Sequence, residues 1–364
     1  MLGLTQLEST LVRGVKRSAK GLNRWRNMAK TRRSATELYR ELVAAGQIEP
    51  LDDTAKALVR EYALDCYGSA VYTPWLEFYT AYRGRFIEGW MPFDYYLHVF
   101  LPTVNPRKIA HISNIKTYTR SLVGQERVPD IATRVDGQWF DVQGEALQLA
   151  DVPDYVFAKT SHVYVKADDI DRGLGVYILD HQAFIDYLER SSGDCVVQWP
   201  IEPHPDLSRF HPESVATLRV LTYKPPRAEP RTITAHLRLG QAQEKFVSSA
   251  GNPLKVQVAD GLGRLASQGI DMAWEKYEAH PDTGIRFSDI AVPGFSEAVG
   301  LCEALHRKVP QLGIVGWDVV IDSKAYAWII EWNAVMPGFK YMEAQCGPLL
   351  PGSDHHSTPV KGFE

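Results

Sequence analysis

The feature that most constrains the fold is a pair of apolar segments of strand length near the C-terminus, residues 316–322 and 328–334. The short polar connection between them, Asp322-Ser323-Lys324, is typical of an antiparallel β-hairpin. Large apolar residues occupy both faces of the two strands: Trp317, Val319, Ile329, Ile330 and Trp332. We therefore expect a largely buried hairpin, in which an acidic side chain needs a partner to stay charged.

This hairpin carries oxygen ligands on both strands. Asp318 lies in the first strand, and Glu331 and Asn333 lie in the second. Because side chains alternate along a strand, Glu331 and Asn333 share a face. With a carboxylate from the neighbouring strand they form an all-oxygen set that suits a hard cation such as Mg²⁺. The alternative is a hairpin whose polar side simply faces solvent.

The composition is that of an ordinary globular protein of one large or two average domains. Of its 364 residues 45% are hydrophobic, which is enough for a sizeable core. No apolar run approaches the roughly 20 residues that span a bilayer, and the N-terminus lacks the pattern of a signal peptide. The four cysteines are scattered without metal or redox spacing: Cys66, Cys195, Cys302 and Cys346. We expect a cytoplasmic protein.

Positive charge gathers at the N-terminus. Residues 1–40 hold ten basic residues against two acidic ones, Glu8 and Glu37. Apolar residues recur there at helical steps of three and four: Leu4, Leu7, Leu11, Val15, Ala19, Leu22 and Trp25. Gly14 and Gly21 interrupt the pattern and argue against one unbroken helix.

Several partners suit this basic arm. The commonest arrangement, which we favour, is a surface helix packed on the body with a solvated basic face. Residues 1–30 could instead make a peripheral contact with an anionic membrane, or bind an acidic partner or RNA. The sequence holds no strong nucleic-acid-binding signal.

The remaining chain predicts an α+β protein with a helical preface. Residues 1–95 read as an α-helical region, with helix breakers at 46–50. Strands and helices alternate over 96–350, and residues 351–364 form a tail. The expected strands are 156–159, 161–165, 176–179, 195–199, 216–222 and 232–238, and a helix is expected at 181–190.

Two elements in this region suit phosphate binding. Lys159 ends a predicted strand, and the turn Gly173-Leu174-Gly175 follows the next one. A lysine supplies a point charge, and a glycine turn lets backbone N–H groups approach a phosphate. The turn alone is a weak signal, because strand connections use glycine anyway. The chain has no P-loop, no dinucleotide-binding fingerprint and no kinase motif set.

The order of these parts resembles the ATP-grasp superfamily, most closely the sugar-transfer-associated ATP-grasp family of α-L-glutamate ligase homologues. The resemblance spans roughly residues 95–345 and rests on the joint order of its motifs. These are Leu101-Pro102-Thr103-Val104-Asn105, Ser214 to Thr222, Leu237-Arg238-Leu239-Gly240, His280-Pro281-Asp282-Thr283-Gly284, Gly316-Trp317-Asp318 and Glu331-Trp332-Asn333.

The resemblance implies a fold of two α+β subdomains that enclose ATP, with Mg²⁺ as the metal. Lys159 matches the strand lysine that contacts the α- and β-phosphates, and Gly173 to Gly175 match the loop that covers them. The strand Val196-Val197-Gln198 matches the hinge whose backbone reads adenine, with Gln198 as the candidate for the ribose.

The same resemblance assigns the catalytic end of the site. Arg219 matches the arginine near the γ-phosphate, and Arg238 is a second candidate for the substrate carboxylate or the transferring phosphoryl group. Asp318, Glu331 and Asn333 match the Mg²⁺ ligands.

Two departures from the family pattern stand out. Where relatives place a lysine at the start of the first nucleotide-domain helix, this chain has isoleucine; Lys116 or Lys108 is the candidate replacement. After Arg238, relatives show an aspartate-asparagine pair before a glycine. Here Ser248-Ser249-Ala250-Gly251-Asn252 stands, which indicates a changed acceptor pocket.

The function implied is an ATP- and Mg²⁺-dependent carboxylate–amine ligase. Such an enzyme forms an amide through an acyl phosphate, here on an amino-acid or sugar-acid type substrate in a biosynthetic pathway. Its partners would be a small-molecule carboxylate and an amine. The alternatives are an ATP-grasp phosphotransferase that acts on a hydroxyl, and a nucleotide-binding protein without turnover.

Overall fold

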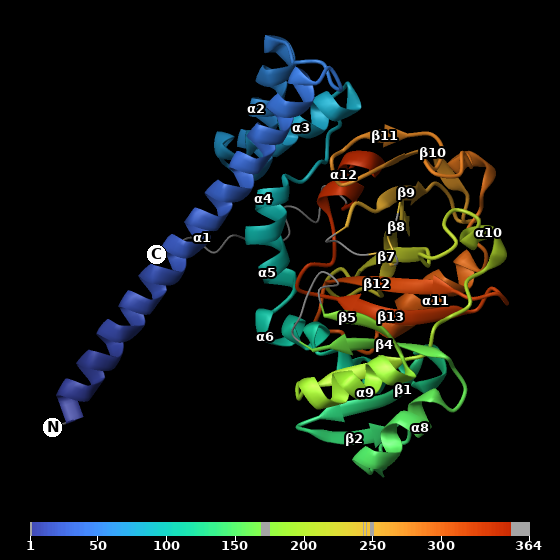
Figure 1. Cartoon of the computed structure of the whole chain (residues 1–364). Helices are drawn as coiled ribbons and strands as arrows, with labels where there is room; N and C mark the ends of the chain where they lie inside the picture. Colours follow the sequence, from blue (N-terminus) through green and yellow to red (C-terminus); the bar gives the residue numbers. More distant parts are fainter. Residues whose placement is uncertain (1, 169–174, 243, 245, 248–250, 351–364) are drawn as a thin grey trace. The chain divides into compact units, whose positions relative to one another are not determined.

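The computed structural model describes residues 2–168, 175–242, 244, 246–247 and 251–350, and for residues 2–22 and 125 it describes only the backbone. The chain divides into two compact units (Figure 1). One unit comprises Met1–Thr103 and Phe339–Glu364, and the other comprises Val104–Gly338. The first unit is therefore built from both ends of the chain.

The first unit is helical, as the sequence predicted. Its elements are α1 (Leu2–Ala44), α2 (Asp53–Tyr67), α3 (Thr73–Arg83), α4 (Phe93–Tyr95), a π-helical turn (Tyr96–Phe100) and α12 (Lys340–Cys346). The short helix α5 (Leu101–Val104) leads into the second unit. Asp52 caps α2 by accepting a hydrogen bond from the Ala55 backbone N–H, and Gly68 ends α2 in a left-handed conformation at φ 68°.

Helix α1 is a single helix of 43 residues. The break expected at Gly14 and Gly21 is wrong, because a glycine inside a helix costs only about 1 kcal/mol relative to alanine and the flanking residues continue the helix. The loop expected at 46–50 is present, and Gly46 adopts φ +69° there. No helix in the described part of the chain is long and apolar enough to cross a bilayer.

The core of the first unit is aromatic. Trp75, Trp90, Tyr79 and Tyr96 are all buried, and Tyr96 stacks on Phe339 with ring centroids 3.8 Å apart. Such stacking adds stability beyond the apolar area that it buries. The C-terminal segment therefore completes the core of the N-terminal helices.

The buried side chain of Glu343 also holds the C-terminal segment in place. Glu343 of α12 accepts hydrogen bonds from the Met91 backbone N–H at 2.7 Å and the Leu349 backbone N–H at 3.0 Å. Burial raises the pKa of Glu343 to about 8, and these two backbone N–H groups oppose the shift.

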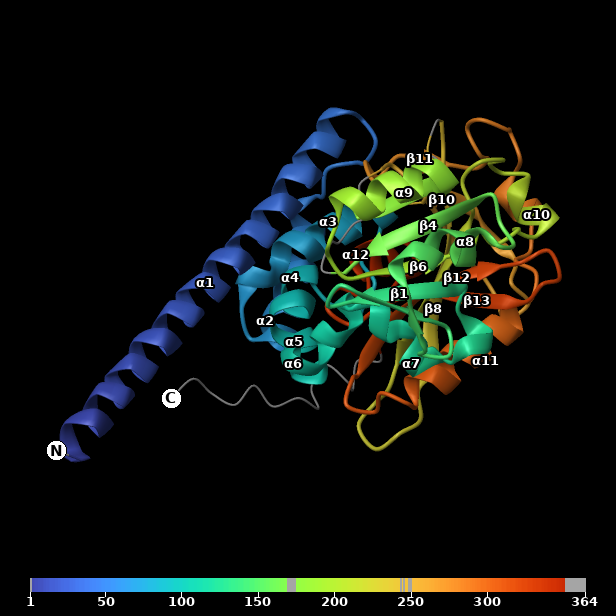
Figure 2. The same ribbon diagram turned by 60° about the horizontal axis from the view of Figure 1, so that its bottom comes forward.

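The second unit begins with a six-stranded antiparallel sheet in the order β3-β2-β1-β6-β4-β5. Its strands are β1 (Asp130–Val135), β2 (Gln138–Asp141), β3 (Ala146–Leu147), β4 (His162–Ala167), β5 (Val176–Asp180) and β6 (Cys195–Gln198). Helices α8 (Val152–Phe157) and α9 (His181–Arg190) pack on this sheet through a shared apolar cluster that includes Val152, Val156 and Phe184 (Figure 2).

A seven-stranded antiparallel sheet follows in the order β11-β10-β9-β8-β7-β12-β13. Its strands are β7 (Thr217–Tyr223), β8 (Arg231–Leu239), β9 (Leu254–Val258), β10 (Leu265–Ile270), β11 (Lys276–Tyr277), β12 (Ile314–Ile321) and β13 (Ala327–Asn333). Helix α11 (Phe295–His306) packs on it. The short helices α6 (Arg107–Ala110) and α7 (Thr119–Val123) precede β1, and α10 (Pro205–Ser208) lies between β6 and β7.

The predicted α+β class is confirmed. The expected strands at 161–165, 176–179, 195–199, 216–222 and 232–238 fall within β4, β5, β6, β7 and β8, apart from one terminal residue in three of them, and the expected helix coincides with α9. The expected strand at 156–159 is wrong. Residues up to Phe157 belong to α8, whose first turn contains Pro153, a position where proline favours a helix.

Candidate functional site

The predicted hairpin forms, and it brings three of the predicted site residues into one row across the sheet. Asp318 on β12 lies directly opposite Glu331 on β13 and opposite Arg219 on β7. Paired residues of an antiparallel ladder point to the same face, so all three side chains share a face.

Arg219 binds Asp318 through two parallel hydrogen bonds. The Arg219 Nε donates to Asp318 Oδ1 at 2.5 Å, and Nη2 donates to Oδ2 at 2.8 Å. Arg238 on β8 reaches the same carboxylate, with Nη1 at 3.5 Å from Oδ1. Asp318 is 4% exposed, so these interactions lie in a largely water-excluded region.

The surroundings of Asp318 keep it ionised. Burial by itself would raise the pKa of this carboxyl group, but Arg219 and Arg238 outweigh it and lower the pKa below its ordinary value. Burial also lowers the pKa of Arg238, and Asp318 opposes that shift.

Glu331 behaves differently. Burial and the neighbouring Asp318 raise the pKa of Glu331, while Lys166, Arg219 and Lys116 oppose the rise. Within the described part of the chain no hydrogen bond to its carboxylate is found. The two carboxylate oxygens of Glu331 are therefore available to bind a cation.

Lys166 joins the two sheets of the second unit at this point. It lies on β4, and its Nζ donates to the Ile330 carbonyl of β13 at 3.1 Å. Burial lowers the pKa of Lys166, and Glu331, Asp130 and Asp318 oppose the shift. The site is thus built from both sheets (Figure 1).

The lysine predicted for the phosphates was the wrong one. Lys159 is exposed and lies in a turn after α8, so it is not on a strand. Lys166 is the lysine that β4 carries into the site. The signal was present, because Lys166 follows the run 161–165 that was expected to be a strand, but nothing in the sequence showed that this strand continued to Ala167.

Lys116, the predicted replacement lysine, lies close enough to act on the cluster through its charge. It begins a 3₁₀ turn, Lys116–Tyr118, and its charge acts on both Lys166 and Glu331. Its backbone N–H donates to Asp168 Oδ1 at 2.6 Å, which fixes the turn beside the end of β4. Lys108 lies in α6.

The adenine contact predicted at Val196-Val197-Gln198 needs correction. These residues lie in β6, whose backbone pairs with β1 on one side and β4 on the other. Backbone groups that already serve two ladders are not available to a base. The extended residues 199–202 that follow β6 belong to no ladder.

Gln198 also has a partner that the sequence did not reveal. Its Nε2 donates to Asp130 Oδ1 at 2.7 Å, and both side chains are buried. Asp130 Oδ2 has no hydrogen-bond partner among the described residues. Burial raises the pKa of Asp130, and Gln198, Lys166 and Arg120 oppose the rise.

The glycine turn is described only in part. Gly173 lies outside the described residues. Gly175 is buried, and its carbonyl accepts a hydrogen bond from the Ala167 backbone N–H at 2.9 Å, which closes the β4–β5 connection.

Cations outnumber carboxylates in this cluster. The groups that act on one another are the cations Lys116, Lys166, Arg219 and Arg238 and the carboxylates Asp130, Asp318 and Glu331. Three of these cations are largely buried with the carboxylates, and the half-buried Lys116 adds the surplus positive charge that an anion would balance. Phosphate groups are anions of this kind.

The residues present fit a hard cation. In the described part of the chain no group of three or more His, Cys, Asp and Glu side chains is placed to hold a metal, so the metal would combine two carboxylates with the Asn333 amide and outside oxygens. Asn333 lies across from Gly316, and its Nδ2 has no hydrogen-bond partner among the described residues. Asp318 keeps unused lone pairs beside Arg219.

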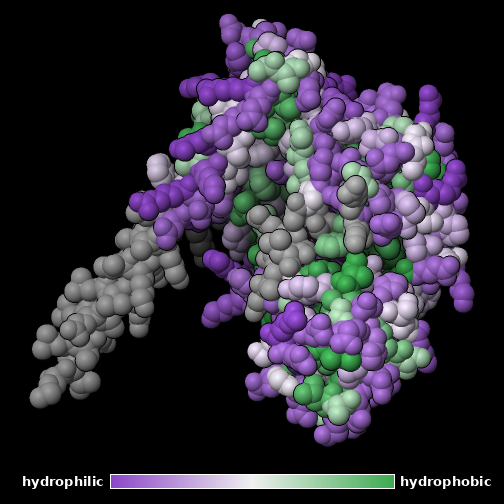
Figure 3. All heavy atoms as spheres, viewed as in Figure 1, coloured by the Kyte–Doolittle hydropathy of each residue, from purple (hydrophilic) through white to green (hydrophobic). Residues whose placement is uncertain are grey.

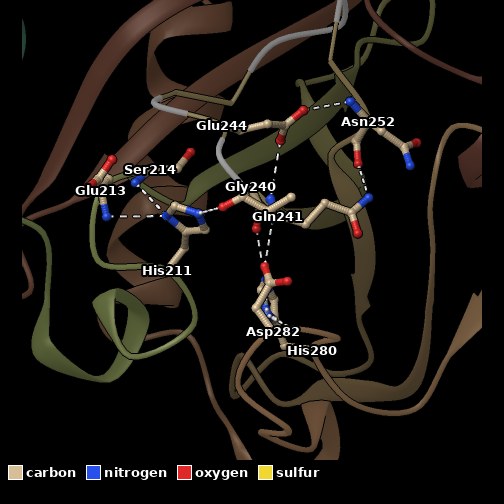
Figure 4. A network of polar contacts seen from close by, with 10 residues as sticks. His211, Glu213, Ser214, Gly240, Gln241, Glu244, Asn252, His280 and Asp282 are labelled. Atoms are coloured by element: carbon tan, nitrogen blue, oxygen red, sulfur yellow. Dashed lines mark hydrogen bonds and ion pairs between the residues drawn. The ribbon is translucent and has the colours of Figure 1, made fainter.

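A second polar network holds the connection between β8 and β9 (Figure 4). The His280 Nε2 lies 2.8 Å from the Gly240 carbonyl, and the His211 Nε2 lies 3.0 Å from the Ala242 carbonyl. The Ala242 backbone N–H donates to Asp282 Oδ2 at 2.7 Å. Because this connection starts two residues after Arg238, the network fixes the chain as it leaves the site.

Asn252 at the far end of this connection has a structural role. Its backbone N–H donates to Glu244 Oε1 at 2.6 Å, and its side-chain Nδ2 donates to Asp271 Oδ2 at 3.1 Å. Its Oδ1 accepts a hydrogen bond from the Met272 backbone N–H at 2.9 Å. These contacts tie the end of the connection to the turn after β10.

Comparison with known families places the protein in the ATP-grasp class. The matching family model is described as sugar-transfer associated ATP-grasp, and it covers residues 97–350. The chain belongs to this family, and the resemblance found in its motifs is confirmed. ATP and Mg²⁺, the cofactors predicted from the sequence, are those of this class.

Solved structures show only distant similarity. A D-alanine-D-alanine ligase from Coxiella burnetii matches with 10% identity and a TM-score of 0.39, over 67% of this chain and 55% of that one. An N5-carboxyaminoimidazole synthase from Aspergillus clavatus matches with 8% identity and a TM-score of 0.41, over 68% and 55%. The chain thus spans about half the length of these proteins, and likeness at this level carries no argument about activity. Among curated proteins no match is found.

Proposed function

We propose that this protein is an ATP- and Mg²⁺-dependent ligase that joins a carboxylate to an amine. The observation that carries the proposal is the buried row of Arg219, Asp318 and Glu331, with Arg238 and Lys166 beside it. Membership of an ATP-grasp family supports the nucleotide as the ligand of this cation-rich cluster.

The division of labour follows from charge and position. Lys166, in place of Lys159, neutralises the phosphates near the end of β4, and Lys116 adds a second charge there. The adenine contact first assigned to the strand itself is taken by the backbone directly after β6, through the Ile201 N–H and the carbonyls of residues 199–201, since the Trp199 N–H donates to the Pro129 carbonyl at 2.9 Å and Pro200 has no N–H. Gly175, whose carbonyl accepts a hydrogen bond from the Ala167 N–H, would lie beside the phosphates.

Arg219 and Arg238 serve the transferring phosphoryl group. Fixed cations in a water-poor site stabilise charge that develops on the phosphoryl oxygens without further reorganisation. Asp318 holds both guanidinium groups in place. Glu331, Asn333 and Asp318 would hold Mg²⁺, which when bound neutralises phosphate charge.

In the proposed reaction, a carboxylate oxygen of the substrate attacks the γ-phosphorus and ADP leaves. The amine then attacks the carbonyl carbon of the acyl phosphate, phosphate leaves, and the amine loses a proton. An amino-acid or sugar-acid type of substrate, in a biosynthetic pathway, remains the expectation from the family resemblance.

The test supplies purified protein with ATP and Mg²⁺ and pairs of co-substrates. Carboxylates are amino acids and sugar acids, and amines are amino acids and amino sugars. Release of ADP and phosphate only when both are present identifies the ligase. Phosphate retained on a single hydroxyl compound identifies the phosphotransferase instead, and nucleotide binding without any turnover on the panel contradicts both enzymes. Glu331→Gln is the matched inactive control.

A further inference from the structure

The basic helix α1 presents different faces in its two halves. In the C-terminal half the face turned toward the rest of its unit is marked by Thr31, Ala35, Leu38 and Leu42. Ala35 is 0% exposed and Leu42 6%, and the Thr31 carbonyl accepts a hydrogen bond from Trp75 Nε1 at 3.1 Å. These positions follow the helical steps of four, three and four.

Followed toward the N-terminus, the same face becomes basic. The helical steps continue from Thr31 through Met28 to the positions Arg24, Lys20, Arg17 and Arg13. The helix is unbroken over this length, so its faces stay in phase from one half to the other. The face that packs in one half is therefore the charged face of the other half.

The apolar stripe of the N-terminal half lies on the opposite side. Its positions are Leu4, Leu7, Leu11, Val15, Leu22 and Trp25; at about 100° per residue Leu7 and Trp25 lie about a third of a turn from the packing face and the others about half a turn. Trp25, the stripe position whose side chain is described, is 63% exposed. Most positions of this stripe lie away from the face that holds the C-terminal half of α1, although Arg32, close to the helical position of Trp25, binds Asp94 at 2.6 Å. The arrangement favoured on sequence grounds, a surface helix packed on the body with a solvated basic face, stays a prediction.

A lipid surface or a second copy of the chain could cover this stripe. The stripe with Val12 and Ala19 is wider than the narrow seam of a coiled coil, which favours lipid. Residues 1–40 carry ten basic and two acidic residues, so two copies packed side by side would repel each other. Hydrophilic residues line the described part of α1 (Figure 3), and the exposed cations Arg24, Arg26 and Lys30 are among them.

We propose that residues 2–25 of α1 lie in the interface of an anionic membrane. The stripe with Trp25 would enter the acyl-chain boundary, and Arg13, Lys16, Arg17, Lys20 and Arg24 on the polar face would attract the helix to the anionic surface. This inference does not depend on the proposed ligase reaction.

The test uses the full chain and flotation with phosphatidylcholine vesicles, with and without phosphatidylglycerol. We expect binding to the anionic vesicles alone at low salt. Binding should fade toward 1 M salt, where the screening length falls to about 3 Å. Arg13→Gln with Lys20→Gln should weaken binding, by about fivefold for each cation near an anionic surface.

Two polar substitutions in the stripe, Leu7→Gln and Leu11→Gln, should abolish binding. The matched control, Ser9→Gln with Thr10→Gln, adds the same side chains outside the stripe and should bind as the wild type does. Lipids with brominated acyl chains should quench part of the tryptophan emission, and Trp25→Phe should remove that quenching while the protein still binds.

Three results would overturn the proposal. One is no binding to anionic vesicles at low salt. Another is equal binding by the stripe variant and its control. The third is dimerisation without vesicles that depends on Leu7 and Leu11, which would assign the stripe to a second copy of the chain.

Discussion

Asp318 and Glu331 face each other across the β12–β13 hairpin, yet their surroundings shift their pKa values in opposite directions. Two arginines lower the pKa of Asp318 and keep it ionised. Burial and the negative charge of Asp318 raise the pKa of Glu331. Asp318 therefore holds the two arginines in position. A bound cation would stabilise the ionised form of Glu331 most. Pairs of groups whose surroundings separate their pKa values are typical of catalytic sites.

Removing the two carboxylates should therefore have different effects on stability. Asp318→Asn leaves buried Arg219 and Arg238 without their anion, and we expect a loss of about 3 kcal/mol or more in the free energy of unfolding. Glu331→Gln should cost less, because Glu331 acts on Lys166, Arg219 and Arg238 through its charge alone and is hydrogen-bonded to none of them. Both should abolish ATP turnover. Denaturant unfolding and an ADP-release assay measure the two effects, and equal destabilisation by both variants would contradict the asymmetry.

Nucleotide affinity should depend on Lys166 and not on Lys159. Lys166→Ala removes a charge that reaches the site from β4, so the Kd for ATP should rise by tenfold or more, about 1.4 kcal/mol. Lys159→Ala is the natural control, because that side chain is exposed in a turn. Titration calorimetry compares the two variants with the wild type. A weaker affinity for ATP in Lys159→Ala and an unchanged affinity in Lys166→Ala would show instead that Lys159 binds the phosphates.

Gly316 allows the backbone to approach Arg219. The Arg219 Nη1 donates to the Pro337 carbonyl at 2.9 Å, and a Cβ on residue 316 would lie 2.3 Å from that oxygen. Gly316→Ala should therefore displace residue 337 and cost about 1 to 3 kcal/mol of stability. Gly300→Ala is the control, because nothing lies within 4 Å of its Cβ and alanine favours helix α11. Denaturant midpoints distinguish the two variants. An unchanged midpoint for Gly316→Ala would show that the backbone near residues 316 and 337 can move apart without loss of stability.

His306 should contribute to the change in the free energy of unfolding with pH. Burial lowers the pKa of this ring from 6.5 to about 4, and the Leu312 carbonyl, 3.0 Å from Nε2, opposes the shift. The unfolded chain then binds more protons than the folded one between pH 4 and 6.5, so stability rises with pH across that window. The gain attributable to this ring is up to about 3 kcal/mol.

His306→Gln should flatten that part of the profile, as measured by urea unfolding at a series of pH values. The exposed His181→Gln serves as the control. An identical slope in wild type and His306→Gln would show that the ring does not control acid stability.

Local patterns account for what the sequence predicted well. The β12–β13 hairpin and helix α9 are defined by residues close in sequence, whose alternation or helical period is visible directly. The Asp318–Glu331 pair follows from the hairpin. The pairing of Asp318 with Arg219 does not, because it depends on the sheet order that places β7 beside β12.

Long-range packing decided what the sequence missed. Lys166 and Lys159 are both lysines near apolar runs, and only the sheet shows which of them reaches Ile330. Likewise, nothing local indicates that β6 is paired on both sides, which removes its backbone from the adenine contact. The membrane prediction for α1 and the roles of the site residues remain to be tested by the experiments above.

The split composition of the helical unit has a consequence for how the protein is made. A ribosome releases residues 1–103 first, but their aromatic core lacks Phe339 and the Glu343 carboxylate until the last part of the chain emerges. The intervening unit, with both of its sheets encoded in one continuous stretch, can fold during that interval. The apolar core residues of the nascent helices stay exposed until then. These helices are therefore the part of the protein that would benefit most from a chaperone.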